Sequence, residues 1–403
     1  MMTTGSTTPF VPLKFIAEIV SGGTPKSDPN NWDGDIPFIT PPDLNGLDGD
    51  VVSQWERTLT DTGTSGSSIT KDAVLLSCRA PIGHVGVVTS EMAFNQGCKS
   101  IVPQDAEDLA YVAYCLVASR RALQALGRGT TFMEISTTQL SNYSIPWPVC
   151  MDRRAITRYL DRETSEIDAM LAALDELTRN LKQRSGIVVA NELKSHYLHG
   201  TIPLAFSSGA DNFFDGDWVE SKDQDPDGDI RLLQLADIGD GTFLDKSNRR
   251  INQEAFERLR CREVQAGDIL IARMPHPLGR ACTLPTGLGR TITVVDVAVL
   301  RPDPNRVIPK YLVYVLNSIS FRAQLDSLQS GSTRQRISRS RLGQQRIPMP
   351  PVALQRAAVS HLDEVTGRID AMLAKVAELK ALLVERRAAL IADVVTGRKK
   401  VPA

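Results

Sequence analysis

The sequence has no apolar run of the roughly 18 residues that a helix needs to cross a bilayer. Residues 1–5 carry no basic side chain ahead of an apolar core, which a secretory signal requires. We therefore expect no membrane segment and predict a cytoplasmic protein. The composition, with 42% hydrophobic and 23% charged residues, is that of an ordinary globular chain, and 403 residues suffice for two or three domains.

Cysteine and histidine are few and scattered. The six cysteines form no CxxC pair, and none of the five histidines lies at ligand spacing from a cysteine. We expect no metal site and no redox pair, and we interpret the cysteines as small buried residues in a reducing compartment. The dispersed histidines also suggest no Ser/His/Asp or Cys/His catalytic set.

Signatures of catalysis are missing as well. There is no GxxxxGK phosphate loop, and residues 41–43 (Pro-Pro-Asp) do not fit the (D/N)PP(Y/F) tetrad of adenine methyltransferases. Two Glu-Leu-Lys triplets, at 192–194 and 378–380, have the ExK shape of nuclease sites, but they fall on predicted long helices where such spacing is common. We expect a non-catalytic chain without a cofactor of its own and keep a stand-alone nuclease as an alternative.

Charge is nearly balanced overall, at a formal net charge of -1, but it is unevenly placed. Acidic side chains outnumber basic ones in the first 130 residues, whereas every charged residue from 334 to 346 is basic. Strong nucleic-acid binders often carry a basic excess because phosphate contacts dominate affinity. If this chain binds DNA, it uses local patches or the help of a partner.

The chain is an internal repeat. The run Ile-Asp-Ala-Met-Leu-Ala occurs at residues 167–172 and again at 369–374, and the same offset relates 145–184 to 347–386 without a gap. A match that holds one register over this distance indicates a tandem duplication. It divides the chain into four segments: globular residues 1–150 and 201–351, and helical residues 151–200 and 352–403.

The globular segments mix short apolar runs, such as 36–39, 73–76 and 85–88, with turn clusters and one longer helical stretch. This pattern predicts α+β domains with short strands. The offset between the two copies drifts by several residues in these segments, so their loops differ. One scaffold that presents two different surfaces is the simplest interpretation.

The two helical segments carry heptads, which predict two long helices paired in antiparallel fashion as a coiled coil. At about 1.5 Å per residue, 40 residues give a rod of roughly 60 Å. A coiled-coil assembly factor that never touches DNA is an alternative. The predicted seam comprises Leu160, Ile167, Met170, Leu174, Leu177 and Leu181 in the first helix, and Leu362, Ile369, Met372, Val376, Leu379, Leu383 and Leu390 in the second.

Several loops have the composition of DNA contacts. In each copy an Arg at a strand end precedes Pro and Gly, which would present a guanidinium to a guanine edge or a phosphate, although a solvated turn explains it equally well. Residues 331–341 combine Gly, hydroxyls and four Arg, and 129–139 is their counterpart. The candidates are Arg79, His84, Asn95, Gln96, Lys99, Thr130 and Thr131 in the first copy, and Arg273, His276, Arg280, Ser332, Thr333, Arg334, Gln335, Arg336, Ser338 and Arg339 in the second.

These motifs together resemble the DNA-specificity subunits of type I restriction-modification systems. The resemblance is carried by residues 331–350, by the heptad segment 369–372 and by the helix ending at 385–397. Residues 21–25 (Ser-Gly-Gly-Thr-Pro) and 32–37 (Trp-Asp-Gly-Asp-Ile-Pro) are typical of the target-recognition domains of that family, and they add Thr24 and Lys26 to the candidates. The resemblance covers nearly the whole chain.

The resemblance implies a non-catalytic subunit whose two recognition domains each read one half of a bipartite site in double-stranded DNA. The paired helices would set the spacing and dock two modification subunits, which supply S-adenosylmethionine and adenine methylation. Restriction subunits would add translocation and cleavage driven by ATP and Mg. This chain departs from the pattern at Glu134, where the second copy has Arg336, and at 182–186, which lacks the Glu-Arg-Arg of the second helix.

Overall fold

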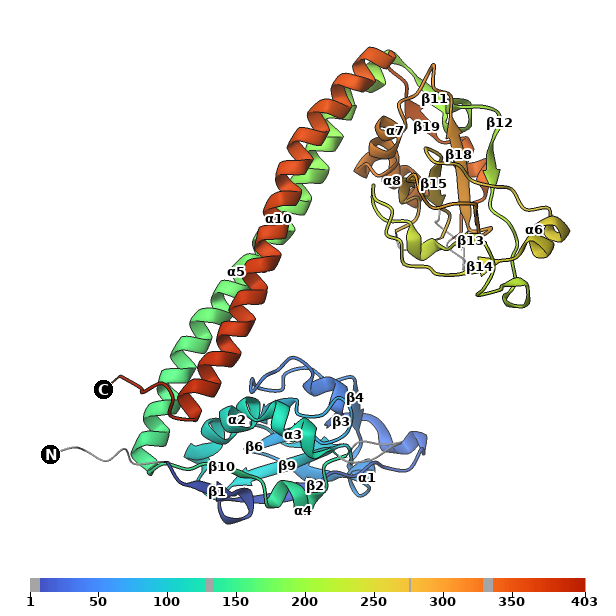
Figure 1. Ribbon diagram of the computed structural model, residues 1–403. Coiled ribbons are helices and arrows are strands. Elements are labelled where there is room, and N and C mark those ends of the chain that lie inside the picture. The colour runs from blue at the N-terminus through green and yellow to red at the C-terminus, as the bar shows by residue number, and fades with distance from the viewer. Residues whose placement is uncertain (1–7, 128–133, 275–276, 329–335, 403) are drawn as a thin grey trace. The chain divides into compact units, whose positions relative to one another are not determined.

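The computed structural model describes residues 8–127, 134–274, 277–328 and 336–402. The chain divides into two compact units (Figure 1). Unit 1 comprises Met1–Leu174 and Ala377–Ala403, and unit 2 comprises Asp175–Val376. Each unit contains one α+β domain packed on segments of two long helices, which confirms the predicted fold class.

The domain of unit 1 is built on two four-stranded sheets and a short ribbon. The first sheet has the order β2 (Ala17–Ser21), β9 (Cys98–Pro103), β6 (Ala73–Ser77), β7 (Val85–Val88) and is antiparallel throughout. The second has the order β4 (Arg57–Leu59), β3 (Trp32–Ile39), β8 (Met92–Phe94), β5 (Ser68–Thr70). The ribbon pairs β1 (Phe10–Pro12) with β10 (Ser144–Pro146).

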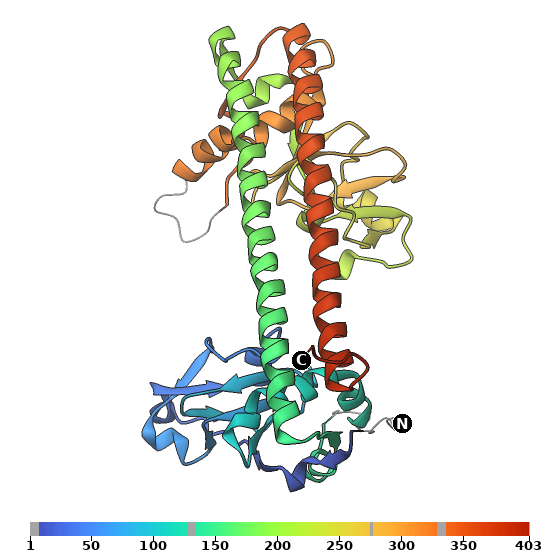
Figure 2. The same ribbon diagram turned by 90° about the vertical axis from the view of Figure 1, so that its left-hand side faces the viewer.

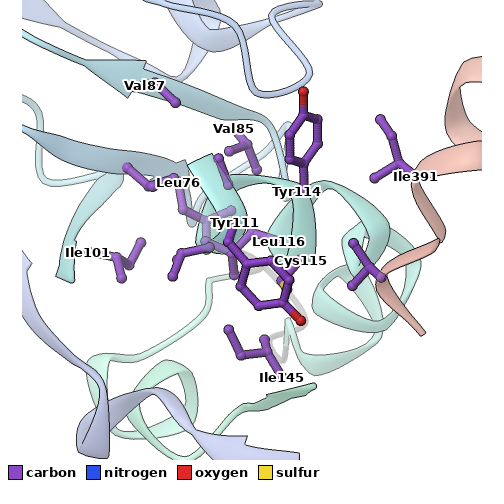
Figure 3. Packing of buried hydrophobic residues seen from close by; sticks show 14 of the residues in the cluster. Leu76, Val85, Val87, Ile101, Tyr111, Tyr114, Cys115, Leu116, Ile145 and Ile391 are labelled. Carbon is purple, nitrogen blue, oxygen red and sulfur yellow. The ribbon is translucent and has the colours of Figure 1, made fainter. Parts of the chain in front are cut away.

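Helix α2 (Leu109–Ala118) is the centre of the unit 1 core. The run Tyr-Val-Ala-Tyr-Cys-Leu gives this helix no charged face, and all six of these residues are buried. Figure 3 shows Tyr111 and Leu116 of α2 among side chains from the first sheet, with Ile391 approaching from a long helix. The Tyr111 hydroxyl donates to the Pro146 carbonyl at 2.9 Å, so the polar tip of this buried ring has a partner. Shorter helices complete the domain: α1 (Asp61–Thr64), α3 (Arg120–Leu126) and α4 (Thr137–Ser141).

The domain of unit 2 repeats this topology. Its first sheet has the order β12 (Ser208–Asp215), β18 (Val297–Pro302), β15 (Ile269–Ala272), β16 (Ala281–Thr283). The second has three strands, β14 (Arg250–Ile251), β13 (Ile230–Leu233) and β17 (Thr291–Thr293), and the ribbon pairs β11 (Thr201–Pro203) with β19 (Arg346–Pro348). The helices are α6 (Gln253–Leu259), α7 (Pro309–Leu316), α8 (Ile319–Ser327) and α9 (Arg339–Gly343).

The two long helices are α5 (Cys150–His196) and α10 (Val352–Val395), and within each unit their segments run in opposite directions (Figure 2). In unit 1 the first half of α5 packs on the last part of α10, where Ile167 and Leu390 share one core. In unit 2 the end of α5 packs on the start of α10, where Leu193 and Leu362 share another. Antiparallel pairing therefore follows from the contacts inside each unit, as the heptads predicted.

Each domain is attached to these helices by the same hydrogen bond. The Tyr114 hydroxyl of α2 donates to Asp161 of α5 at 2.8 Å in unit 1. In unit 2 the Tyr314 hydroxyl of α7 donates to Asp363 of α10 at 2.7 Å. The duplication thus preserves the junction between domain and helix as well as the topology.

The heptad prediction is correct for one line of the seam and wrong for the other. Leu160, Ile167, Leu181, Leu362, Ile369, Val376, Leu383 and Leu390 are buried, and Leu174 is half-buried. Met170, Leu177, Met372 and Leu379 are instead 43–52% exposed. The second line of the seam lies four residues after the first: Thr164 and Arg387 on it are buried, and Leu171, Thr366 and Leu373 are half-buried.

The reason for the error is that a 3.6-residue turn allows either three- or four-residue steps from the first line. Threonine and arginine occupy part of the true second line, so an apolar pattern could not reveal it. The predicted methionines and leucines lie one position away, on the solvent side.

Within the described ranges, no helix is long and apolar enough to span a membrane, and no three potential ligands gather as a metal site. All six cysteines are free, and five are buried. Burial raises the pKa of the Cys78 thiol to about 12, which suits inert core residues rather than reactive ones.

Candidate nucleic-acid interface

In unit 1, three predicted residues that lie far apart in the sequence meet at one end of the sheets. We call Thr24, Arg79, Asn95 and Glu134 the unit 1 cluster. The Asn95 amide nitrogen donates to Thr24 Oγ1 at 3.2 Å, and Arg79 Nε pairs with Glu134 Oε2 at 2.8 Å. The backbone N–H of Arg79 also donates to the carbonyl of Gly97, two residues beyond Asn95. The cluster is partly solvent-exposed, and it combines an amide, a hydroxyl and an ion pair.

A close backbone crossing holds this cluster together. A Cβ at Gly22 would lie 2.1 Å from the carbonyl oxygen of Asn95, so only glycine fits where the chain after β2 passes over the end of β8. This crossing brings Thr24 beside Asn95. Thr24, Lys26 and Gln96 are exposed around it, while Thr130 and Thr131 lie outside the described residues.

One predicted contact of unit 1, Lys99, is structural instead, which corrects the expectation for it. Lys99 is only 3% exposed, and its Nζ lies 3.4 Å from Ser21 Oγ beneath the cluster. The His84 backbone N–H donates to Ser77 Oγ, and burial, with the nearby Arg120 charge, lowers the pKa of its imidazole. The Lys99 side chain is therefore not presented to a ligand, whereas His84 is half-buried and its Nδ1 has no hydrogen-bond partner among the described residues.

In unit 2, acidic and basic side chains gather at the equivalent strand ends. We call Asp215, Arg273, Asp296, Arg336 and Arg339 the unit 2 cluster. Arg336 Nη2 lies 2.9 Å from Asp296 Oδ1. Asp215 accepts a hydrogen bond from Arg339 Nε at 3.2 Å, and its other carboxylate oxygen forms an ion pair with Arg273 Nη2 at 3.2 Å. Three guanidinium groups against two carboxylates leave one excess positive charge, which favours an anionic ligand.

Only part of this cluster can reach a ligand. Arg273 is 5% exposed, hydrogen-bonds the Val295 carbonyl and shares Asp215, and burial lowers the pKa of its guanidinium. The prediction that Arg273 contacts DNA is therefore corrected to a scaffolding role. Arg336 and Arg339 have side chains 38% and 43% exposed, and they form the accessible surface of the cluster.

Arg280 is corrected in the same way. It donates to the carbonyls of Ile238 at 2.7 Å and Leu235 at 2.9 Å, so it ties two loops together. Ser338 caps α9, where its Oγ accepts the Arg341 backbone N–H at 3.3 Å. The other candidates of this copy, His276, Ser332, Thr333, Arg334 and Gln335, lie outside the described residues.

The two clusters occupy equivalent places, and one position that they share carries opposite charge. Ile135 donates to the Cys78 carbonyl at 3.0 Å, and Ile337 donates to the Arg273 carbonyl at 3.1 Å, so the preceding residues Glu134 and Arg336 correspond. Glu134 pairs with an arginine, whereas Arg336 pairs with an aspartate. The same scaffold therefore presents two electrostatically different surfaces.

A groove in unit 2 was missed by sequence reasoning. It has a volume of about 810 Å³ and is lined by residues from four separate stretches of the chain, among them Trp218, Gln234, Lys246, Arg249 and Asp296. Asp296 also belongs to the unit 2 cluster, so the groove and the cluster adjoin. The run Lys-Ser-Asn-Arg-Arg at 246–250 was the signal that could have pointed to it.

Comparison with known proteins identifies the family. The family profile described as the type I restriction modification DNA specificity domain matches residues 7–179 and 214–381, which together form more than half of the chain. The two matched ranges contain one α+β domain each. They also include much of both long helices.

Individual relatives agree with the family match. The chain is 30% identical over 182 residues to the type I restriction enzyme MjaIX specificity subunit of Methanocaldococcus jannaschii, a match that covers 44% of this chain and 40% of that protein. It is 26% identical over 297 residues to the StySPI specificity subunit of Salmonella potsdam, covering 70% and 63%. The matches thus span less than two thirds of either relative.

One solved structure is similar over the full chain. It comes from a study of complex assembly and conformational transition of the type I R-M system, and its chain matches with a TM-score of 0.71 at 16% identity. The match covers 99% of this chain and 100% of that one. At this identity the likeness establishes the fold.

Proposed function

Because the chain belongs to the family of type I restriction modification DNA specificity domains, we propose that it is a non-catalytic subunit that binds double-stranded DNA in a sequence-specific manner. The observation that carries the proposal is the pair of strand-end clusters. Both lie at the same place on duplicated domains, yet one pairs Arg79 with Glu134 and the other pairs Arg336 with Asp296. Copies that served only as structural supports would have no need of reversed charge at this place.

Each unit would read one half of a bipartite target. Exposed Arg and amide side chains suit base edges and phosphates in the major groove, and the two clusters offer different sets of them. Unit 1 offers Asn95 and Gln96 beside a neutralised arginine, whereas unit 2 offers Arg336 and Arg339. Two different half-sites are the expected consequence.

The long helices would set the distance between half-sites and dock two modification subunits. The docking role is supported by apolar side chains on α5 and α10 that stay exposed when the helices pair, among them Met170 and Met372. S-adenosylmethionine would then be bound by the modification subunits, and ATP with Mg by restriction subunits. This chain would contribute recognition alone.

The alternatives make different predictions. If the chain were a nuclease, Glu192 would be expected to bind a metal ion. Its carboxylate lies on the paired helices instead, 3.8 Å from His361 Nε2. The purified chain with Mg²⁺ and DNA should neither cleave nor methylate. A coiled-coil assembly factor would show no preference among duplexes of different sequence.

The experiment is to co-express the chain with the modification subunit of its own system and map methylated adenines in the host genome. The expected result is one bipartite motif, and purified complex should bind that duplex more tightly than a scrambled one at a stated salt concentration. Methylation without a motif, or equal binding to both duplexes, would contradict the proposal. DNA cleavage by the chain alone would favour the nuclease.

A further inference from the structure

The groove of unit 2 has an exposed aromatic wall. Trp218, just after β12, is 66% exposed, and its only described polar contact is the indole Nε1 donating to Glu220 at 3.4 Å. A tryptophan left open at the edge of an 810 Å³ groove provides a large apolar face for a ligand.

The same groove contains an unsatisfied hydrogen-bonding group. Gln234 lines it, and within the described ranges its amide nitrogen Nε2 is buried without a partner. The Gln234 backbone is fixed, because its N–H donates to Asp237 Oδ2 at 2.7 Å. A ligand acceptor that entered the groove would remove the cost of this unpaired donor.

The acidic side chains that line the groove all have compensating partners. Glu220 pairs with Lys222 at 2.7 Å and Asp296 pairs with Arg336 at 2.9 Å, while Asp217 accepts the Arg262 backbone N–H at 3.1 Å. These carboxylates therefore repel an anionic ligand less than their number suggests.

The basic side chains of the groove have no charged partner among the described residues. Lys246 and Arg249, which line the groove, are exposed, and neither forms an ion pair with any residue that the structure describes. Lys246, Ser247 and Asn248 also line a second cavity of about 270 Å³ beside the groove, so residues 246–248 form a ridge between the two. The ridge presents positive charge and the exposed amide of Asn248.

We infer that this groove reads an A·T base pair in the half-site bound by unit 2, with Trp218 against the thymine methyl group and the amides of Gln234 and Asn248 toward adenine. Amide side chains match the N6 and N7 edge of adenine, and an apolar face matches the C5 methyl of thymine. Lys246 and Arg249 contact the flanking phosphates. This inference rests on the proposed function and adds the residues and the base pair.

Unit 1 cannot read this pair in the same way. A Cβ at Gly216 would lie 2.2 Å from the Val294 carbonyl oxygen, the same crossing that Gly22 makes, so Trp218 corresponds to Thr24. Thr40 corresponds to Gln234, because both cap a short turn with a backbone N–H to an aspartate three residues on. The aromatic wall and the amide are thus both specific to unit 2.

The test uses the full chain in its methyltransferase complex, with the duplex found by methylation mapping. Trp218→Ala and Gln234→Leu should each weaken binding about fivefold or more, whereas Phe206→Ala, which removes an exposed aromatic side chain of unit 2 that does not line the groove, should not. Replacing thymine by uracil in the unit 2 half-site removes only the methyl group. At the thymine that contacts Trp218, this replacement should weaken DNA binding by the wild-type chain and leave DNA binding by Trp218→Ala unchanged.

The outcomes separate the two claims. If no thymine of that half-site is sensitive to loss of its methyl group, or if wild type and Trp218→Ala are equally sensitive, the groove inference is overturned while the proposed function stands. If the wild-type complex does not discriminate the mapped duplex from a scrambled one, the proposed function itself fails. Thermal unfolding of each variant identifies any loss of affinity that comes from misfolding.

Discussion

Arg387 of α10 donates from Nε to Asp168 of α5 at 3.1 Å, and the same guanidinium reaches Asp50 of the unit 1 domain at 3.1 Å. One side chain therefore joins both helices and the domain that they carry. It is 8% exposed, so this junction is largely shielded from water. Its counterpart at the repeat offset in unit 2 is Ser185, which cannot form such a link.

Removing this guanidinium should destabilise unit 1. Arg387→Ala leaves Asp168 and Asp50 without their shared partner, and hydrogen bonds to charged groups contribute about 1.5–3 kcal/mol, so we expect a loss of about 2 kcal/mol in the free energy of unfolding. Arg386→Ala, one exposed position away, is the matched control. Urea unfolding measures both, and an equal effect of the two variants would contradict this role.

The converse substitution should stabilise unit 2. Ser185 lines a cavity of about 910 Å³ together with Asp370, the counterpart of Asp168, whereas the cavity beside Arg387 measures about 610 Å³. Ser185→Arg places a cation near Asp370 and improves helix propensity, which together should add about 1 kcal/mol. Ser185→Gln is the control, because it supplies a similar helix propensity without the charge. If the two variants gave the same change in urea unfolding, the ion pair would have no part in it.

Asp217 should make the stability of unit 2 depend on pH. Burial raises the pKa of its carboxyl to about 6, so the folded state holds this proton more tightly than the unfolded state does. With a raised folded-state pKa, unfolding releases the proton, and the free energy of unfolding falls as pH rises from about 4 to about 6. Thermal unfolding measured at several pH values should show a weaker dependence of stability on pH in Asp217→Asn. Asp229→Asn, at an exposed position, should keep the dependence of the wild-type chain.

Loss of Arg336 should weaken DNA binding, whereas loss of Arg280 should lower stability. Arg336→Ala removes an accessible cation of the unit 2 cluster, so DNA binding should weaken by about 1–3 kcal/mol if Arg336 reads a base, or the salt slope should drop by about 1 if it contacts a phosphate. Arg280→Ala breaks bonds to two loop carbonyls and should mainly lower the melting temperature. A salt slope that Arg336→Ala leaves unchanged, with unchanged affinity, would remove it from the interface.

The duplicated topology and the paired helices could be predicted, because an internal repeat and a heptad pattern can both be recognised in the sequence alone. The phase of the second seam line could not, because Met170 and Leu171 differ by one position and both are apolar. Arg273 and Arg336 look alike in sequence, yet only the packing of loops from distant segments buries one and exposes the other. The groove at Trp218 is built from four separate stretches, so no local pattern could reveal it.

The central claim is that each unit reads its own half of a bipartite DNA site. It is tested most directly by replacing residues 201–351 with a copy of residues 1–150 and mapping methylated adenines in cells that also express the modification subunit. Because the helices pair in antiparallel fashion, the hybrid should methylate a motif that contains the first half-site twice, in opposite orientations. A motif that keeps the original second half-site would contradict the claim.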